Sequence, residues 1–179
     1  MILYHGSLEK VVVPVLNKSK NSNDFGKGFY LTSSKEQAIR WAIRNMKVNN
    51  YNTSYVSCFE FNNVDNLKIL KFDCPSFEWL NFIIKNRKNY DFNVDYDIII
   101  GPVANDQVYN TIILFEEKII DYGQTIKKFL TQKLFDQYLF KTEKAMKKLK
   151  FIECFEVNIW IKKYLVFILN SLVREYAIY

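Results

Sequence analysis

Short β-prone runs alternate with helical segments along residues 1–156 of the chain. Each run is shorter than an ordinary helix and is rich in aromatic or β-branched residues. Because helical patterns lie between several of these runs, strands and helices are interleaved along the chain. This order predicts one α+β domain in which helices pack against β-sheet. The runs expected to be strands are Ile2–Tyr4, Phe29–Thr32, Tyr55–Phe61, Leu67–Phe72, Asp97–Ile100, Gln137–Phe140 and Phe151–Val157.

The segment after residue 32 carries the clearest helix signals. Ser33 and Glu36 form a capping box, whose side chains satisfy the free backbone N–H groups at a helix start. Further helices are expected after Pro75, from Asp106 onward and from Thr142 through Lys150. The apolar residues of the first helix recur at helical spacing, which predicts a buried face of Ala38, Trp41, Ala42 and Met46.

Residues 157–179 are expected to form a C-terminal helical appendage that follows the domain at 1–156. Between Trp160 and Tyr176 the apolar side chains recur at i, i+3 and i+4, as in an amphipathic helix. This apolar stripe could pack on the parent domain, mediate dimerisation, dock a partner protein or lie on a membrane surface. Lys162 and Lys163 interrupt the most apolar stretch, so no membrane-spanning helix is expected.

The positive charge of the chain is concentrated in its last third. The formal net charge is +6, and residues 1–122 hold 14 Lys/Arg and 14 Asp/Glu, against 11 and 5 in residues 123–179. A basic surface attracts nucleic acid or an acidic protein, although lysines on helix exteriors also serve solubility. One alternative function is therefore a non-catalytic domain that binds nucleic acid or a partner protein through Lys127, Lys128, Lys141, Lys144, Lys147, Lys148 and Lys150.

Cysteine usage and the N-terminal residues indicate a reducing compartment. Cys58, Cys74 and Cys154 lack the paired spacing of metal sites and disulfide frameworks. The N-terminus has no basic region followed by an apolar run, so no secretory signal is expected. A cytoplasmic location is the expectation.

His5 is the only histidine in the chain. Metal sites that need several imidazoles and triads that need a second base are therefore excluded unless His5 serves alone, and no metal site is expected. A lone histidine more often satisfies a buried hydrogen bond than performs chemistry. The residues around His5 favour a functional role.

Five segments together resemble a known family: Tyr4–Ser7, Asp24–Thr32, Gln37–Ala42, Asp95–Asp106 and Asp136–Ala145. The pattern is similar to that of a bacterial domain-of-unknown-function family in the ADP-ribosyltransferase superfamily, of the diphtheria-toxin-like branch with a His, Tyr and Glu/Gln/Asp signature. The resemblance covers residues 2–156 and leaves the C-terminal segment without a counterpart. It implies two small, strongly bent, split β-sheets with flanking helices that hold NAD as a co-substrate.

The resemblance also implies roles for individual residues. His5 would hydrogen-bond the adenosine ribose, the Gly6 backbone would bind the nicotinamide amide, and Tyr30 would lie against the nicotinamide ring. Gln137 would reach the hydroxyls of the nicotinamide ribose, with Asp106 or Glu143 as alternative third polar groups. The expected catalytic residues are His5, Tyr30 and Gln137, and the expected NAD-binding residues are His5, Gly6, Ser7, Gly28, Tyr30, Thr32 and Asp106.

The chemistry of NAD cleavage suits these residue types. The bond between ribose and cationic nicotinamide breaks through an oxocarbenium-like state, and the leaving group needs no acid. Catalysis then requires that NAD is held bent and that dipoles stabilise the charge that spreads onto the ribose. An aromatic ring over the nicotinamide contributes roughly 0.5 to 2 kcal/mol of cation–π attraction. Structural alternatives stay open: Tyr30 as a core aromatic residue, and Gly26 and Gly28 as turn residues.

An amide at position 137 limits the choice of acceptor. Gln137 cannot take a proton from an acceptor, and Phe135 occupies the position where arginine-modifying relatives have a second carboxylate. Arginine modification is therefore disfavoured, and the acceptor must already be nucleophilic. The expected function is mono-ADP-ribosyl transfer to a protein or nucleic acid, as a bacterial toxin paired with an antitoxin protein. NAD hydrolysis by water is the nearer alternative.

Overall fold

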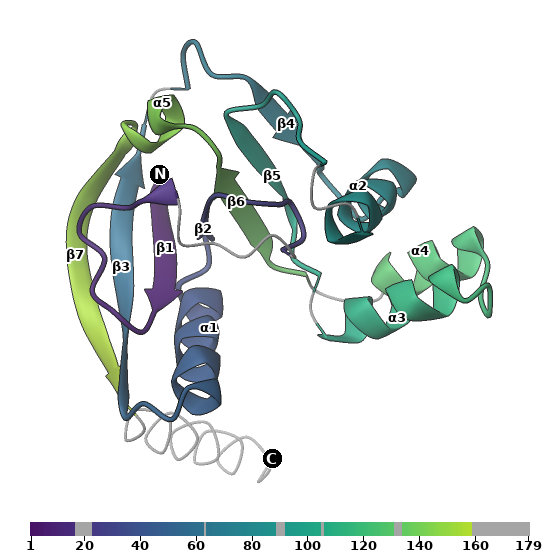
Figure 1. The fold of residues 1–179 in the computed structure, drawn as a ribbon, viewed down its shortest axis with the longest axis horizontal. Helices are drawn as coiled ribbons and strands as arrows, with labels where there is room; N and C mark the ends of the chain where they lie inside the picture. The colour runs from purple at the N-terminus through teal and green to yellow at the C-terminus, as the bar shows by residue number, and fades with distance from the viewer. Residues whose placement is uncertain (17–22, 63, 89–91, 105, 131–133, 159–179) are drawn as a thin grey trace, which may run out of the picture.

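The computed structural model describes residues 1–16, 23–62, 64–88, 92–104, 106–130 and 134–158. Within these ranges the chain forms two β-sheets and five helices, which confirms the α+β prediction (Figure 1). The expected C-terminal helix lies outside the described residues, apart from its first two positions. No helix in the described ranges combines the length and the apolar character needed to cross a membrane.

The first sheet has the strand order β1-β3-β7. It consists of β1 (Ile2–Ser7), β3 (Thr53–Phe61) and β7 (Leu149–Asn158), and both pairings are antiparallel. Helix α1 (Lys35–Val48) packs against this sheet, where Ala38 and Ala42 are buried with Val56 and Val157. Strand β7 continues two residues beyond the expected domain boundary at 156.

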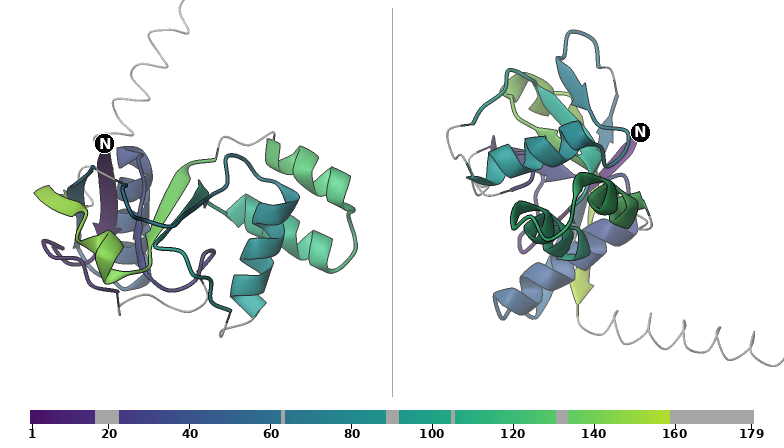
Figure 2. Two further views of the ribbon diagram at one scale, coloured as in Figure 1. Left: turned by 90° about the horizontal axis from the view of Figure 1, so that it is seen from above. Right: turned by 90° about the vertical axis from the view of Figure 1, so that its right-hand side faces the viewer.

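The second sheet has the order β2-β6-β5-β4. Its strands are β2 (Phe29–Leu31), β6 (Asp136–Phe140), β5 (Ile98–Pro102) and β4 (Ile69–Lys71). The β4–β5 pairing is parallel and the others are antiparallel. Figure 2 shows this sheet beside the first one, as a separate layer of strands.

Three further helices lie beside the second sheet, and a fourth connects it to the first sheet. Helices α2 (Phe77–Lys88), α3 (Asp106–Glu116) and α4 (Tyr122–Leu130) lie at the side away from β7, whereas the short α5 (Glu143–Met146) follows β6 and precedes β7 (Figure 1). Successive residues of β5 and β6 alternate between two apolar clusters, as strand geometry requires. Ile98 and Phe140 pack with Leu3, Phe29 and Phe59, whereas Ile99 and Leu139 pack with Phe25, Trp79, Val108 and Phe129.

Within the described residues, an isolated bridge between Tyr4 and Thr32 joins the two sheets. The Tyr4 N–H donates to the Thr32 carbonyl at 2.8 Å, and the Thr32 N–H donates to the Tyr4 carbonyl at 3.0 Å. Strand β1 therefore lies next to the end of β2 even though the two belong to different sheets. This junction sets the relative positions of the residues that the sequence singles out.

Two expectations for α1 were wrong. The N-cap of α1 is Ser34, whose Oγ accepts the Gln37 N–H, while Ser33 bonds to Asp136 instead. Trp41 is 49% exposed, so it does not belong to the buried face of α1.

Candidate active site

The three expected catalytic residues lie on three neighbouring strands. His5 is on β1, Tyr30 is on β2 and Gln137 is on β6. The Tyr4–Thr32 bridge joins β1 to the end of β2, and β2 pairs with β6 in a register that places Tyr30 opposite Leu139. These three strands, which are far apart in sequence, therefore lie side by side where the two sheets join (Figure 1).

The imidazole of His5 is half-buried and has a defined tautomer. Its Nδ1 lies 2.7 Å from the Tyr30 carbonyl oxygen. Because a carbonyl only accepts, Nδ1 carries the proton and donates, which leaves Nε2 of the neutral ring as an acceptor. Burial lowers the pKa of His5 from 6.5, and the backbone hydrogen bond partly opposes that shift. The ring packs against Phe29, with 4.4 Å between ring centroids.

The phenol of Tyr30 turns toward the segment that precedes β2. Its hydroxyl donates to the Gly26 carbonyl at 2.7 Å and accepts the Phe25 N–H at 3.1 Å. Burial raises the pKa of Tyr30 well above 10, and the negative charge of Asp24 raises it further. The imidazole of His5 and the phenol of Tyr30 thus contact different groups, and the link between the two residues is the Tyr30 carbonyl.

The side chain of Gln137 is buried, with 8% of the residue exposed. Its Nε2 donates to Asp24 Oδ2 and to the Pro102 carbonyl, both at 3.1 Å. Since both partners can only accept, the amide orientation is determined by chemistry, with –NH₂ toward Asp24. Oε1 is then the end of the amide that can accept a hydrogen bond from a ligand.

Asp24 and Arg87 also belong to this site, although no role was predicted for them from the sequence. Asp24 Oδ1 accepts from Arg87 Nη2 at 2.5 Å, and Oδ2 also accepts the Ala104 N–H at 3.0 Å. The side chains are 12% and 20% exposed, so this ion pair is largely shielded from water. The guanidinium lies over the Tyr109 ring, 4.9 Å from its centroid, and its Nη1 is buried without a hydrogen-bond partner. Asp24 is the first residue of the motif segment Asp24–Thr32, and this position is the sequence signal that could have identified it as a site residue.

The expected NAD-binding glycines have structural reasons of their own. A Cβ atom on Gly6 would overlap the Ala38 carbonyl oxygen, because α1 crosses β1 at that residue. Gly28 has φ +150°, and a Cβ there would overlap the Phe140 carbonyl oxygen. Both positions therefore require glycine for close approach of protein backbone. The neighbouring Ser7 is half-buried and its Oγ donates to the Glu9 carbonyl at 2.5 Å.

The remaining predicted polar residues are distributed unevenly. Thr32 is buried, and its Oγ1 donates to Asp136 Oδ1 at 2.9 Å, one residue before Gln137. Asp106 is the first residue of α3, but its side chain lies outside the described part of the structure. Glu143 begins α5, beyond the opposite end of β6 from Gln137 (Figure 1). Glu143 is therefore not beside the other site residues.

The seven lysines of the nucleic-acid alternative do not form one surface. Lys127 and Lys128 are on α4, while the other five lie between the end of β6 and the start of β7, around α5 (Figure 1). Lys141 is half-buried and donates to Asn93 Oδ1 and the Val94 carbonyl. Lys144 donates to the Asn66 carbonyl.

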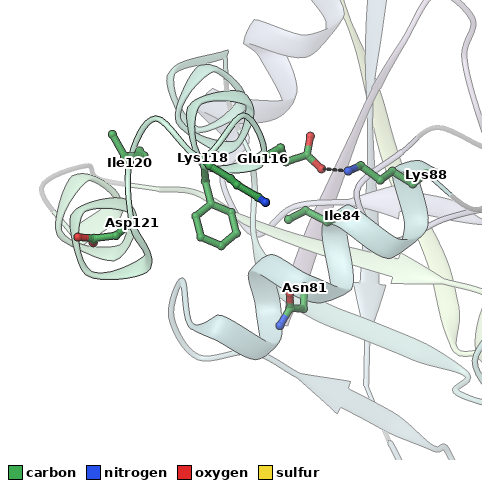
Figure 3. A pocket seen from close by; sticks show the side chains of 8 residues that line it. Asn81, Ile84, Lys88, Glu116, Lys118, Ile120 and Asp121 are labelled. Carbon is green, nitrogen blue, oxygen red and sulfur yellow. Dashed lines mark ion pairs between the residues drawn. The ribbon is translucent and has the colours of Figure 1, made fainter.

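A depression of about 560 Å³ lies between α2 and the turn that joins α3 to α4 (Figure 3). An ion pair of 2.7 Å between Lys88 and Glu116 crosses one side of it. None of the predicted site residues lines this depression. Among the described residues, no group of three or more His, Cys, Asp or Glu side chains could hold a metal ion. The lining residues are Asn81, Ile84, Lys88, Phe115, Glu116, Lys118, Ile120 and Asp121.

The model of a family described as a protein of unknown function, DUF3990, matches residues 1–151. No curated protein matches the chain.

Proposed function

The chain belongs to the DUF3990 family, and on that premise we propose that it is a mono-ADP-ribosyltransferase that uses NAD as co-substrate. The observation that carries the proposal is the arrangement of His5, Tyr30 and Gln137 on three adjacent strands where two small sheets meet. Such an arrangement suits a ligand that is held bent across the junction of split sheets.

His5 and Gln137 each have one polar atom that the hydrogen bonds described above do not use, and Tyr30 is half-buried. The neutral imidazole of His5 can accept a ribose hydroxyl at Nε2, because Nδ1 is already committed to the Tyr30 carbonyl. The ring of Tyr30 can lie against nicotinamide while its hydroxyl stays bound to Gly26. Gln137 can accept a hydroxyl of the nicotinamide ribose at Oε1 while Nε2 stays bound to Asp24.

The reaction needs little proton transfer. The bond from ribose C1′ to the nicotinamide nitrogen breaks, and nicotinamide leaves with the electron pair as a neutral molecule. A lone pair of the acceptor then forms the new bond to C1′, and the acceptor's proton passes to water. The protein's task is to hold NAD bent and to stabilise the cationic ribose.

The residues around position 137 favour an acceptor that is already nucleophilic. Phe135, two residues before Gln137, carries no carboxylate and instead lies under the Arg40 guanidinium, 5.6 Å from ring centroid to Cζ. A base, a phosphate or an activated side chain of a macromolecule would need no general base from the protein. We extend the proposal to a bacterial toxin whose modification of a macromolecule is held in check by an antitoxin protein.

The proposal is tested by measuring nicotinamide release from NAD by the purified protein, with and without a cell extract as the source of acceptors. We expect extract-dependent release that His5→Ala and Tyr30→Ala both abolish. Tyr138→Ala is the matched control, because Tyr138 lies on β6 and is half-buried without taking part in the contacts of Tyr30. If Tyr138→Ala abolishes nicotinamide release to the same extent, the loss in Tyr30→Ala does not support a role of Tyr30 in NAD cleavage.

Two other outcomes separate the alternatives. Free ADP-ribose as the only product, at the same rate without extract, would identify an NAD glycohydrolase that uses the same residues. Normal NAD binding with no nicotinamide release under any condition would defeat the transferase proposal.

A further inference from the structure

The amide of Gln137 is held in one orientation by groups from two other parts of the chain. Asp24 lies in the segment before β2, and Pro102 ends β5. Their oxygens both lie 3.1 Å from Nε2, so the amide cannot turn over without placing its oxygen against a carboxylate and a carbonyl. A reversed amide would lose two hydrogen bonds inside a buried site and gain repulsion in their place.

Asp24 in turn is held by three donors. Arg87 Nη2, the Ala104 N–H and Gln137 Nε2 all point at its two oxygens. This carboxylate is thus stationary, and it is directed at residue 137 rather than at solvent. A glutamate at position 137 would bring a second carboxylate to about the same 3.1 Å separation.

We propose that Asp24 is the positioning residue of this site. Its carboxylate favours a glutamine over a glutamate at position 137, and it orients the amide so that Gln137 Oε1 is the acceptor for a ribose hydroxyl. The proposal rests on the proposed function for the identity of the ligand, a ribose diol of NAD. The carboxylate of Asp24, in the segment before β2, orients the amide of Gln137. Asp24 does not itself touch the ligand.

The charged and titratable side chains relevant to position 137 include four from different parts of the fold. Asp24 comes from the preceding segment, Arg87 from α2 and Tyr30 from β2. Asp136 is the neighbour on β6, but its oxygens accept from Thr32 and Ser33 and not from Gln137. Among the hydrogen bonds of the described residues, Gln137 bonds to Asp24 and to none of the other three, and Asp136 is a matched control on the same strand.

The first arm of the test needs no NAD. In Gln137→Glu, the introduced carboxyl retains a proton in the folded state to a higher pH than in the unfolded chain, because Asp24 is adjacent. The variant should then lose stability as pH rises: relative to wild type, we expect its Tm to be about 5 °C lower at pH 8 than at pH 5. Adding Asp24→Asn should remove that pH dependence, whereas adding Asp136→Asn should leave it. Equal Tm of Gln137→Glu and wild type at pH 8, or rescue by Asp136→Asn, would overturn the proposal.

The second arm compares NAD with an analogue that has a 2′-deoxyribose on the nicotinamide side. Wild type should bind NAD about tenfold more tightly than the analogue, since one hydrogen bond to Oε1 is lost. Gln137→Met should bind NAD and the analogue equally. Gln137→Glu combined with Asp24→Asn should regain the preference for NAD. A purely structural role of Asp24 would not restore that preference. If Gln137→Met keeps the preference, the proposal fails while the NAD-dependent function stands. If the first arm succeeds and the wild type binds no NAD, the proposed function fails and the positioning of Gln137 by Asp24 stands.

Discussion

Breaking the shielded ion pair between Asp24 and Arg87 should cost far more stability than breaking an exposed one. In Arg87→Met the carboxylate of Asp24, which is 12% exposed, loses the ionic partner that it has among the described residues, so its charge is left uncompensated in a largely buried site. Removing one partner of a buried pair costs about 3 to 5 kcal/mol. The lower end applies here, because the Ala104 N–H and Gln137 Nε2 still donate to the carboxylate.

A cost of about 3 kcal/mol corresponds to a fall in Tm of roughly 6 to 12 °C for a chain of this size. We would measure it by urea and thermal unfolding at pH 7. Asp24→Asn combined with Arg87→Met removes both charges and should recover more than half of the loss. Arg40→Met is the matched control, since the Arg40–Glu36 pair is 63% and 62% exposed and should leave the Tm nearly unchanged. Equal, small effects of Arg87→Met and Arg40→Met would refute the claim that the Asp24–Arg87 pair is buried.

Three further predictions concern the same region. Because burial lowers the folded-state pKa of His5 below 6.5, the unfolded chain binds the imidazole proton more tightly than the folded protein does. The free energy of unfolding should therefore be highest above pH 6.5 and fall as the pH drops below 6.5, by at most about 1.4 kcal/mol per pH unit. Urea midpoints from pH 7 to pH 5 would show this slope, and His5→Gln should flatten it. Gly6→Ala should destabilise the fold by about 1 to 3 kcal/mol through overlap with α1, whereas Gly123→Ala, on the exposed start of α4, should be neutral or slightly stabilising; equal effects in thermal melts would contradict the packing argument. NAD at 100 times its Kd should stabilise the protein by about 2.7 kcal/mol, visible as a rise in Tm that is absent in Tyr30→Ala; no rise in wild type would count against NAD as the ligand.

The strands were largely predictable from the sequence because each is a compact apolar run bounded by polar residues. The residue that caps the N-terminus of α1 was less predictable. Ser33 and Ser34 are equally good N-cap residues on sequence grounds, and the choice between them is made by Asp136, a residue distant in sequence that takes the Ser33 hydroxyl and N–H. Trp41 satisfies the helical spacing of α1, but the narrow approach of β1 to α1 at Gly6 is filled by Ala38 and Ala42, which leaves the larger ring outside.

For the candidate site, the sequence predicted which strands would carry the polar residues but not the pairs that those residues form. His5, Tyr30 and Gln137 could be identified from motif segments, and their strands do lie side by side. The partners Asp24 and Arg87 could not be paired in advance, because their contact depends on how α2 sits against the segment before β2. Such long-range pairing is a property of the packed core, which places Phe25 beside Ile83 and Leu80 in one cluster.

The packing of Phe25 is also what connects the stability of the fold to the geometry of the site. Phe25 is fully buried, and the residues on either side of it hold Gln137 through Asp24 and the Tyr30 hydroxyl through Gly26. A change that displaces this one aromatic ring would therefore move two site residues at once, from two different strands. Shortening it by Phe25→Leu should consequently reduce NAD affinity as well as stability, whereas a substitution of equal cost in the α1 cluster, such as Val56→Ala, should reduce stability alone.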